Sequence, residues 1–140
     1  SFTVMSAGRG MFTGEQNQVR HEALMDIVML EGYGYVEMEG GFIEDDGVKV
    51  VTEPSLFIPE MIIDDAVEIG RSFYQESVLF KDYDVFGYVS CRDKNIGEVT
   101  MNFKKNAGVD NISDLENVEK FFSALAKGKD AGRRFAFTGK

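Results

Sequence analysis

The first thirty residues change from an apolar stretch to glycines and then to apolar positions of helical period. Residues 2–7 predict a strand, and the segment Gly-Arg-Gly-Met-Phe-Thr-Gly at 8–14 predicts a loop. Thr13 precedes Gln16 by three residues, which is the spacing of a helix capping box, and Gly32 is a typical helix stop. We therefore expect a helix over residues 14–31. Its predicted apolar stripe consists of Val19, Ala23, Ile27 and Leu30, flanked by Leu24 and Val28.

The next segment alternates with the period of a strand. Residues 33–42 predict one strand, Asp45-Asp46-Gly47 predicts a hairpin turn, and residues 48–58 predict the partner strand. Pro54 interrupts this partner strand, and we expect an edge position or a bulge there.

The second half predicts two more helices and three short strands. A helix over about residues 65–75 has capping spacing between Asp65 and Glu68 and a close-approach glycine at Gly70. Strands are expected at 77–81, 85–91 and 97–103. A third helix is expected from Ser113 to the stop at Gly128, with Leu115, Val118, Phe121, Phe122 and Leu125 on its buried face.

The resulting order β-α-β-β-α-β-β-β-α predicts an α+β fold. In such a fold, helices pack on one face of a largely antiparallel sheet. We expect one domain over residues 1–127, followed at 128–140 by a basic C-terminal tail or an edge strand.

The composition is that of a globular domain. Hydrophobic residues make up 44% of the 140, the only cysteine is Cys91, and no run reaches the roughly 20 apolar residues that cross a bilayer. No signal peptide is recognisable. We expect a cytoplasmic protein that does not associate with membranes, in the host cytoplasm if it is encoded by a phage.

Charge is distributed unevenly. The net charge is −9, residues 31–68 hold eleven acids and one base, and residues 127–140 hold five bases and one acid. A negative body disfavours direct nucleic-acid binding. It leaves open a solvated face, a DNA-like mimic, or a surface for a protein partner or a second copy of the chain. The expected partner-binding residues are Glu37, Glu39, Glu44, Asp45 and Asp46 on the acidic side and Arg133 and Arg134 on the basic side.

One segment has the composition of a small-molecule site. Gly8, Arg9 and Gly10 precede a helix start, where free amides and cations commonly hold anions. The spacing matches neither the Walker loop nor the dinucleotide fingerprint. A glycine turn with no ligand is the structural alternative. The expected ligand-binding side chains on the adjoining helix are Asn17, Arg20 and His21.

Three further polar positions complete the candidate site, namely Glu53, Ser55 and Gln75. In order and spacing, N-x-x-R at 17–20, E-P-S at 53–55 and G-x-x-x-x-Q-x-S-V-L at 70–79 resemble an uncharacterised domain family of bacterial and bacteriophage genomes. The resemblance covers about residues 3–81. It implies an α+β fold and a phage origin, and it supplies no reaction.

Catalytic and metal-binding patterns are weak. His21 is the only histidine, and no serine or cysteine is placed by sequence as its nucleophile. Neither Glu37 with Glu39 nor the turn at 44–46 has the spaced ligands of a calcium loop. Arg20 could pair with Glu53 or with backbone carbonyls. We expect no catalytic residue, no metal and no cofactor.

These observations lead to one main hypothesis and two alternatives. The main hypothesis is a non-enzymatic, phage-encoded acidic protein that modulates a host or viral protein. One alternative is a nucleotide- or phosphate-binding protein or small enzyme that uses the pocket between the glycine loop and the first helix. The other is a DNA-mimic inhibitor of a nucleic-acid-binding protein.

Overall fold

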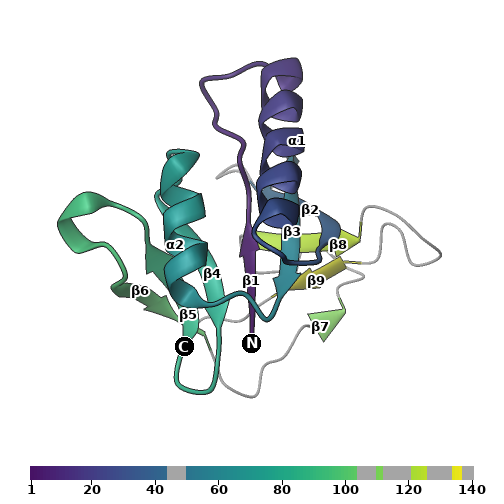
Figure 1. The fold of residues 1–140 in the computed structure, drawn as a ribbon. Helices are drawn as coiled ribbons and strands as arrows, with labels where there is room; N and C mark the ends of the chain where they lie inside the picture. Colours follow the sequence, from purple (N-terminus) through teal and green to yellow (C-terminus); the bar gives the residue numbers. More distant parts are fainter. Residues whose placement is uncertain (44–49, 104–109, 112–120, 126–133, 137–140) are drawn as a thin grey trace.

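Two helices lie against one face of an antiparallel sheet in the computed structural model of the protein (Figure 1). The structure describes residues 1–43, 50–103, 110–111, 121–125 and 134–136. This arrangement confirms the α+β fold class predicted from the sequence.

Among the described residues, nine strands form one sheet in the order β6-β5-β4-β1-β3-β2-β8-β9-β7. Neighbouring strands pair antiparallel. The strands are β1 (Phe2–Met5), β2 (Val36–Ile43), β3 (Val50–Pro59), β4 (Ser77–Lys81), β5 (Phe86–Ser90), β6 (Val99–Asn102), β7 (Asp110–Asn111), β8 (Phe121–Leu125) and β9 (Arg134–Ala136). A short 3-10 helix, Asp93–Asn95, connects β5 to β6.

The first helix, α1 (Gly14–Leu30), begins at the predicted residue and ends one residue before the predicted end. Both hydrogen bonds of the capping box between Thr13 and Gln16 are present, and Gly32 follows the helix with φ +89°. The predicted apolar stripe is wrong in part, because Val19 is 65% exposed and Leu30 is 86% exposed. The buried positions of α1 are His21, Leu24 and Val28. Apolar residues occur all around this helix, so its period alone did not identify the face that meets the sheet.

The second helix, α2 (Ile63–Ser72), starts two residues earlier than predicted. Its N-cap is Ile62, which makes no side-chain capping bond, so the predicted cap at Asp65 is wrong. The close approach predicted at Gly70 is confirmed. A Cβ there would lie 2.8 Å from both the Cys91 Sγ and a Val78 methyl carbon.

The prediction of a third helix is wrong where it can be compared. Residues 121–125 form strand β8, which pairs with β2, whereas 112–120 and 126–128 lie outside the described residues. The run Phe-Phe-Ser-Ala-Leu satisfies either a helical or a strand pattern, and pairing with a distant strand selects the second. Within the predicted tail, Arg134–Ala136 pair with β8 and β7 as strand β9.

Pro54 lies inside β3 rather than at its end. On one side β3 pairs with β2 through Pro54, but on the other side β1 pairs only with Leu56–Pro59. Pro54 therefore stands beyond the end of β1. A residue without an N–H is tolerated there because no β1 carbonyl requires its donor.

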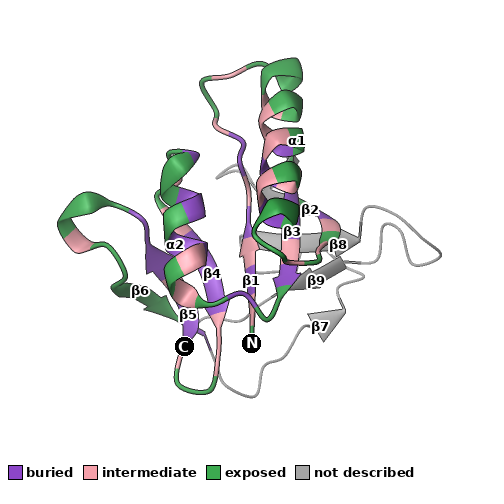
Figure 2. Ribbon diagram, viewed as in Figure 1, coloured by how far each residue is buried: buried purple, intermediate pink, exposed green. Residues whose placement is uncertain are grey.

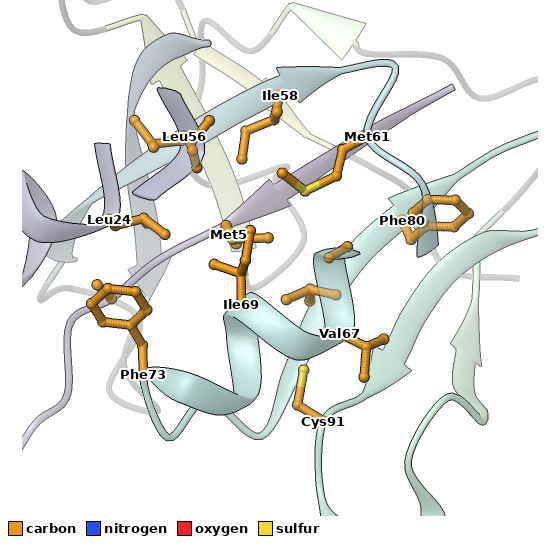
Figure 3. Close-up of a cluster of buried hydrophobic side chains, with 14 of the residues drawn as sticks. Met5, Leu24, Leu56, Ile58, Met61, Val67, Ile69, Phe73, Phe80 and Cys91 are labelled. Carbon is orange, nitrogen blue, oxygen red and sulfur yellow. The ribbon is translucent and has the colours of Figure 1, made fainter. Parts of the chain in front are cut away.

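The main core lies between the helices and the sheet, where Figure 2 shows the buried residues on the inner sides of α1 and α2. Leu24 of α1 and Ile69 and Phe73 from the α2 region approach Met5 and Leu56 of the sheet (Figure 3). A smaller cluster contains Leu79, Phe86 and Phe103, with Phe2, Val4 and Tyr88 packed against it. Since Val4 alternates with Met5 along β1, this second cluster lies on the face opposite the helices.

No helix in the described part of the chain combines the length and apolar character that a membrane crossing requires.

Candidate functional site

The glycine loop runs from the end of β1 to the start of α1 and is fixed by hydrogen bonds within the chain. The Gly8 amide donates to the Ser6 hydroxyl at 3.1 Å, and the Thr13 amide donates to the Gln16 side chain at 2.9 Å. Asn17 closes the middle of the loop, because it accepts from the Arg9 amide at 2.9 Å and donates to the Arg9 carbonyl at 3.1 Å. The loop therefore has a defined shape before any ligand binds.

Arg20 links this loop to the turn after α2. Its Nε donates to the Ala7 carbonyl at 2.6 Å, and its Nη2 donates to the Phe73 carbonyl. The guanidinium also lies 4.9 Å from the ring centroid of Phe12 and 5.6 Å from that of Phe73, within the range of cation–π attraction. Of the two partners considered from sequence, Arg20 takes backbone carbonyls, and neither of these hydrogen bonds goes to Glu53.

Gln75 makes the second link between the same two segments. Its side-chain amide donates to the Gly8 carbonyl at 3.1 Å and to the Phe73 carbonyl at 3.4 Å. Because Arg20 and Gln75 both reach the Phe73 carbonyl, two side chains predicted from distant parts of the sequence meet at one atom.

The Glu53 carboxylate lies close to Gly8 of the loop. A Cβ on Gly8 would be 3.0 Å from the Glu53 Oε2 and 3.6 Å from the Asn17 side chain, so glycine leaves room for both. Although Glu53 is exposed as a residue, partial desolvation raises the pKa of its carboxyl, and the nearby Ser6 hydroxyl offsets part of that rise. The upward direction of this pKa shift indicates that water does not fully solvate the carboxylate.

Ser55 stands two residues further along β3 and is buried. Its hydroxyl makes no hydrogen bond in the structure, which is uncommon for a buried polar group. A Cβ on Gly40, the residue opposite Glu53 in β2, would lie 3.7 Å from this hydroxyl and 3.5 Å from the Glu53 carbonyl. The hydroxyl therefore faces a part of β2 where no side chain intervenes.

His21 does not join this group. Its Nε2 lies 3.3 Å from a carboxylate oxygen of Glu37 on β2, and both its exposure and the exposure of Glu37 are low. The other ring nitrogen, Nδ1, is buried and has no partner. His21 is thus directed from α1 towards the sheet, whereas Asn17 and Arg20 on the same helix contact the loop.

The predicted partner-binding residues are only partly described. Glu37 is engaged by His21, and Glu39 is exposed on β2. Arg134 belongs to β9. The remaining predicted positions lie outside the described residues, namely Glu44, Asp45, Asp46 and Arg133.

The described residues hold no cluster of three or more histidine, cysteine or acidic side chains suited to a metal ion. The candidate site consists of five side-chain groups around the glycine loop: the Glu53 carboxylate, the Ser55 hydroxyl, the Asn17 and Gln75 amides and the Arg20 guanidinium. The loop amides named above, those of Gly8, Arg9 and Thr13, all donate within the chain. What the arrangement offers to a ligand is the Glu53 carboxylate, because the Ser55 hydroxyl is buried.

The model of the S-adenosylmethionine lyase family matches residues 3–123 of this chain. The chain belongs to the S-adenosylmethionine lyase family. The matched range runs from β1 into β8 and includes every residue of the site described above. No curated protein sequence matches the chain.

Membership in the S-adenosylmethionine lyase family corrects the functional prediction. The hypothesis of a non-enzymatic interaction protein is wrong, since the family is named for a reaction. The small-enzyme alternative is favoured over both that hypothesis and the DNA mimic. The uneven charge did not distinguish an enzyme from an interaction protein, because acidic surfaces occur on both.

Several members of the site were not predicted from the sequence. Ser6, Phe12 and the backbone carbonyls of Ala7 and Phe73 were not singled out. Carbonyl acceptors leave no trace in a sequence, because every residue has one. Ser6 and Phe12 could have been found from their place beside the glycines.

Proposed function

We propose that the protein cleaves S-adenosyl-L-methionine without using water, as a lyase. The observation that carries this proposal is the family match over residues 3–123. The convergence of Glu53, Gln75 and Arg20 on the Gly8 loop supports it, because it supplies a defined polar site in the same range.

The charges of the substrate suggest a role for Glu53. S-adenosylmethionine has two cations, the sulfonium and the α-ammonium, and one α-carboxylate. Cleavage turns the sulfonium into a neutral thioether, so a carboxylate next to sulfur would stabilise the substrate more than the transition state. We therefore assign the Glu53 carboxylate to the α-ammonium, where its attraction persists through the reaction.

Two non-hydrolytic routes break the bond between sulfur and the γ-carbon. In one, a substrate carboxylate oxygen bonds to the γ-carbon while the carbon–sulfur electron pair moves to sulfur, giving homoserine lactone. In the other, a base removes a β-proton, a carbon–carbon double bond forms, and the same electron pair moves to sulfur. Both routes release 5′-methylthioadenosine. Both are distinguished from hydrolysis by the absence of oxygen taken from water.

The surroundings of the site favour the first route. The opposite charges of the carboxylate and the sulfonium are neutralised as the lactone forms. A site that holds little water favours this loss of charge more than a well-hydrated site does. The half-buried loop, fixed by Arg20 and Gln75 against Phe73, would limit water on one side of the substrate. No strongly basic side chain among those described at the site is required.

The test is to incubate purified protein with S-adenosyl-L-methionine in water enriched in oxygen-18 and to analyse the products by liquid chromatography and mass spectrometry. We expect 5′-methylthioadenosine above the uncatalysed rate, with no oxygen-18 in the lactone when it is first formed. Glu53→Gln should lower kcat/KM by about tenfold or more, as expected for one lost charge-assisted contact.

A matched control is Glu22→Gln, which removes the same charge from the exposed side of α1. It should leave kcat/KM unchanged. Product formation no faster than in protein-free buffer would refute the proposed function.

A further inference from the structure

The two helices end in the same backbone motif but with different residues. After α1, the Gly32 amide donates to the Met29 carbonyl and the Tyr33 amide donates to the Val28 carbonyl. After α2, the Tyr74 amide donates to Arg71 and the Gln75 amide donates to Gly70 in the same pattern. Both are Schellman motifs, in which the first residue past the cap takes a left-handed conformation.

Glycine occupies that position after α1, at φ +89°, whereas tyrosine occupies it after α2, at φ +57°. A Cβ makes the left-handed region unfavourable, which is why glycine is usual there. Tyr74 therefore costs the fold free energy that Gly32 does not.

The described residues provide no hydrogen bond or ring contact to the Tyr74 side chain that would offset this cost. Tyr74 is 71% exposed, and within the part of the chain that the structure describes its side chain makes no hydrogen bond or ring contact. Its value to the protein is thus not in the stability of the fold. A strained, exposed residue with no hydrogen bond or ring contact of its own is a candidate for a functional contact.

The neighbours of Tyr74 place it at the candidate site. The preceding carbonyl, that of Phe73, accepts from both Arg20 and Gln75. The following residue, Gln75, donates to the Gly8 carbonyl. Tyr74 is therefore an exposed aromatic residue that the Schellman motif at the end of α2 holds between two members of the site.

We propose that Tyr74 stacks against the adenine base of the substrate and contributes to nucleoside specificity. This inference rests on the proposed function, which supplies a substrate containing a planar purine. An aromatic side chain that stacks on a base contributes binding free energy, and truncating that side chain removes the contribution.

The experiment compares Tyr74→Gly and Tyr74→Phe with wild-type protein. Three quantities are measured: the melting temperature, kcat and KM for S-adenosyl-L-methionine, and the dissociation constant for 5′-methylthioadenosine. Tyr74→Gly should melt at a higher temperature because the left-handed strain is relieved. The same variant should show a KM and a dissociation constant raised by about tenfold, with kcat little changed. Tyr74→Phe should bind as the wild type does.

Tyr83→Gly serves as the matched control, since Tyr83 is fully exposed in the turn between β4 and β5. It should leave KM and the dissociation constant unchanged. A Tyr74→Gly variant that is stabilised but binds like the wild type would overturn the inference. So would a lower melting temperature, because the ring would then support the fold.

The failure of this inference can be separated from the failure of the proposed function. If wild-type protein binds 5′-methylthioadenosine but cleaves nothing, the reaction is wrong, while a Tyr74-dependent dissociation constant still supports the base contact. If wild-type protein binds no nucleoside, the base contact is overturned as well.

Discussion

Glu53 illustrates how one carboxylate can oppose folding and still be retained. Desolvation raises the pKa of this group in the folded protein, so the folded state binds its proton more readily than the unfolded chain does. Any stability gained from this group is therefore complete below its unfolded pKa, and it is lost as the pH rises through the folded pKa. At neutral pH the charged form is a net cost to the fold.

We predict that Glu53→Gln melts at a higher temperature than the wild type at pH 7. The difference should shrink as the pH falls to about 4, where the wild-type carboxyl becomes protonated in both states. Thermal melts over this pH range measure the effect, and Glu22→Gln controls for the change in net charge. A Glu53→Gln variant that is less stable at pH 7 would mean that the carboxylate has a stabilising partner.

At the scale of secondary-structure elements, Arg20 joins three segments that are distant in sequence. It lies on α1 and donates to carbonyls in the glycine loop and in the turn between α2 and β4. Removing it would leave two half-buried carbonyls without their charged donor and would also remove two ring contacts.

We predict that Arg20→Ala lowers the free energy of unfolding by about 1–3 kcal/mol. Arg20→Lys should recover only part of the loss, because an ammonium cannot match the fork of a guanidinium. Urea denaturation measures these changes, and Lys94→Ala, at an exposed residue of the 3-10 helix, should change stability by less than about 0.5 kcal/mol. Similar changes in unfolding free energy for Arg20→Ala and Lys94→Ala would show that water can replace Arg20 as the hydrogen-bond donor to the two carbonyls.

Local sequence signals predicted some of these elements better than others. Thr13 and Gln16 define the start of α1 through a bond between near neighbours, and β4 occupies the predicted residues 77–81. Phe121–Leu125 were misassigned because their partner, β2, lies about eighty residues away in the chain. The left-handed conformation of Tyr74 could not be predicted from the sequence either, because tyrosine is not typical of that conformation.

At the scale of the whole molecule, the fold class and most of the candidate site followed from sequence, but the reaction did not. Arg20, Asn17, Glu53 and Gln75 stood out as polar residues without a core role, and the structure brings them to one loop. Their chemistry fits many ligands, because a carboxylate, an amide and a guanidinium recognise charge and hydrogen bonding rather than one molecule. Only the match over residues 3–123 identified a reaction.

The tight contact between Gly70 and Cys91 has a practical consequence for following motion in this protein. The chain has one thiol, it is 2% exposed beneath α2, and burial raises its pKa to about 11. An alkylating reagent can therefore reach it only when α2 separates from β4 and β5, so the labelling rate measures how often that separation occurs. We predict that iodoacetamide modifies the native protein about a hundredfold more slowly than the urea-unfolded chain. Mass spectrometry of quenched samples gives both rates, and equal rates would show that α2 opens freely. If saturating 5′-methylthioadenosine slows the labelling further, α2 and the turn at Tyr74 become more rigid together when the nucleoside binds, and a single sulfur atom reports on both.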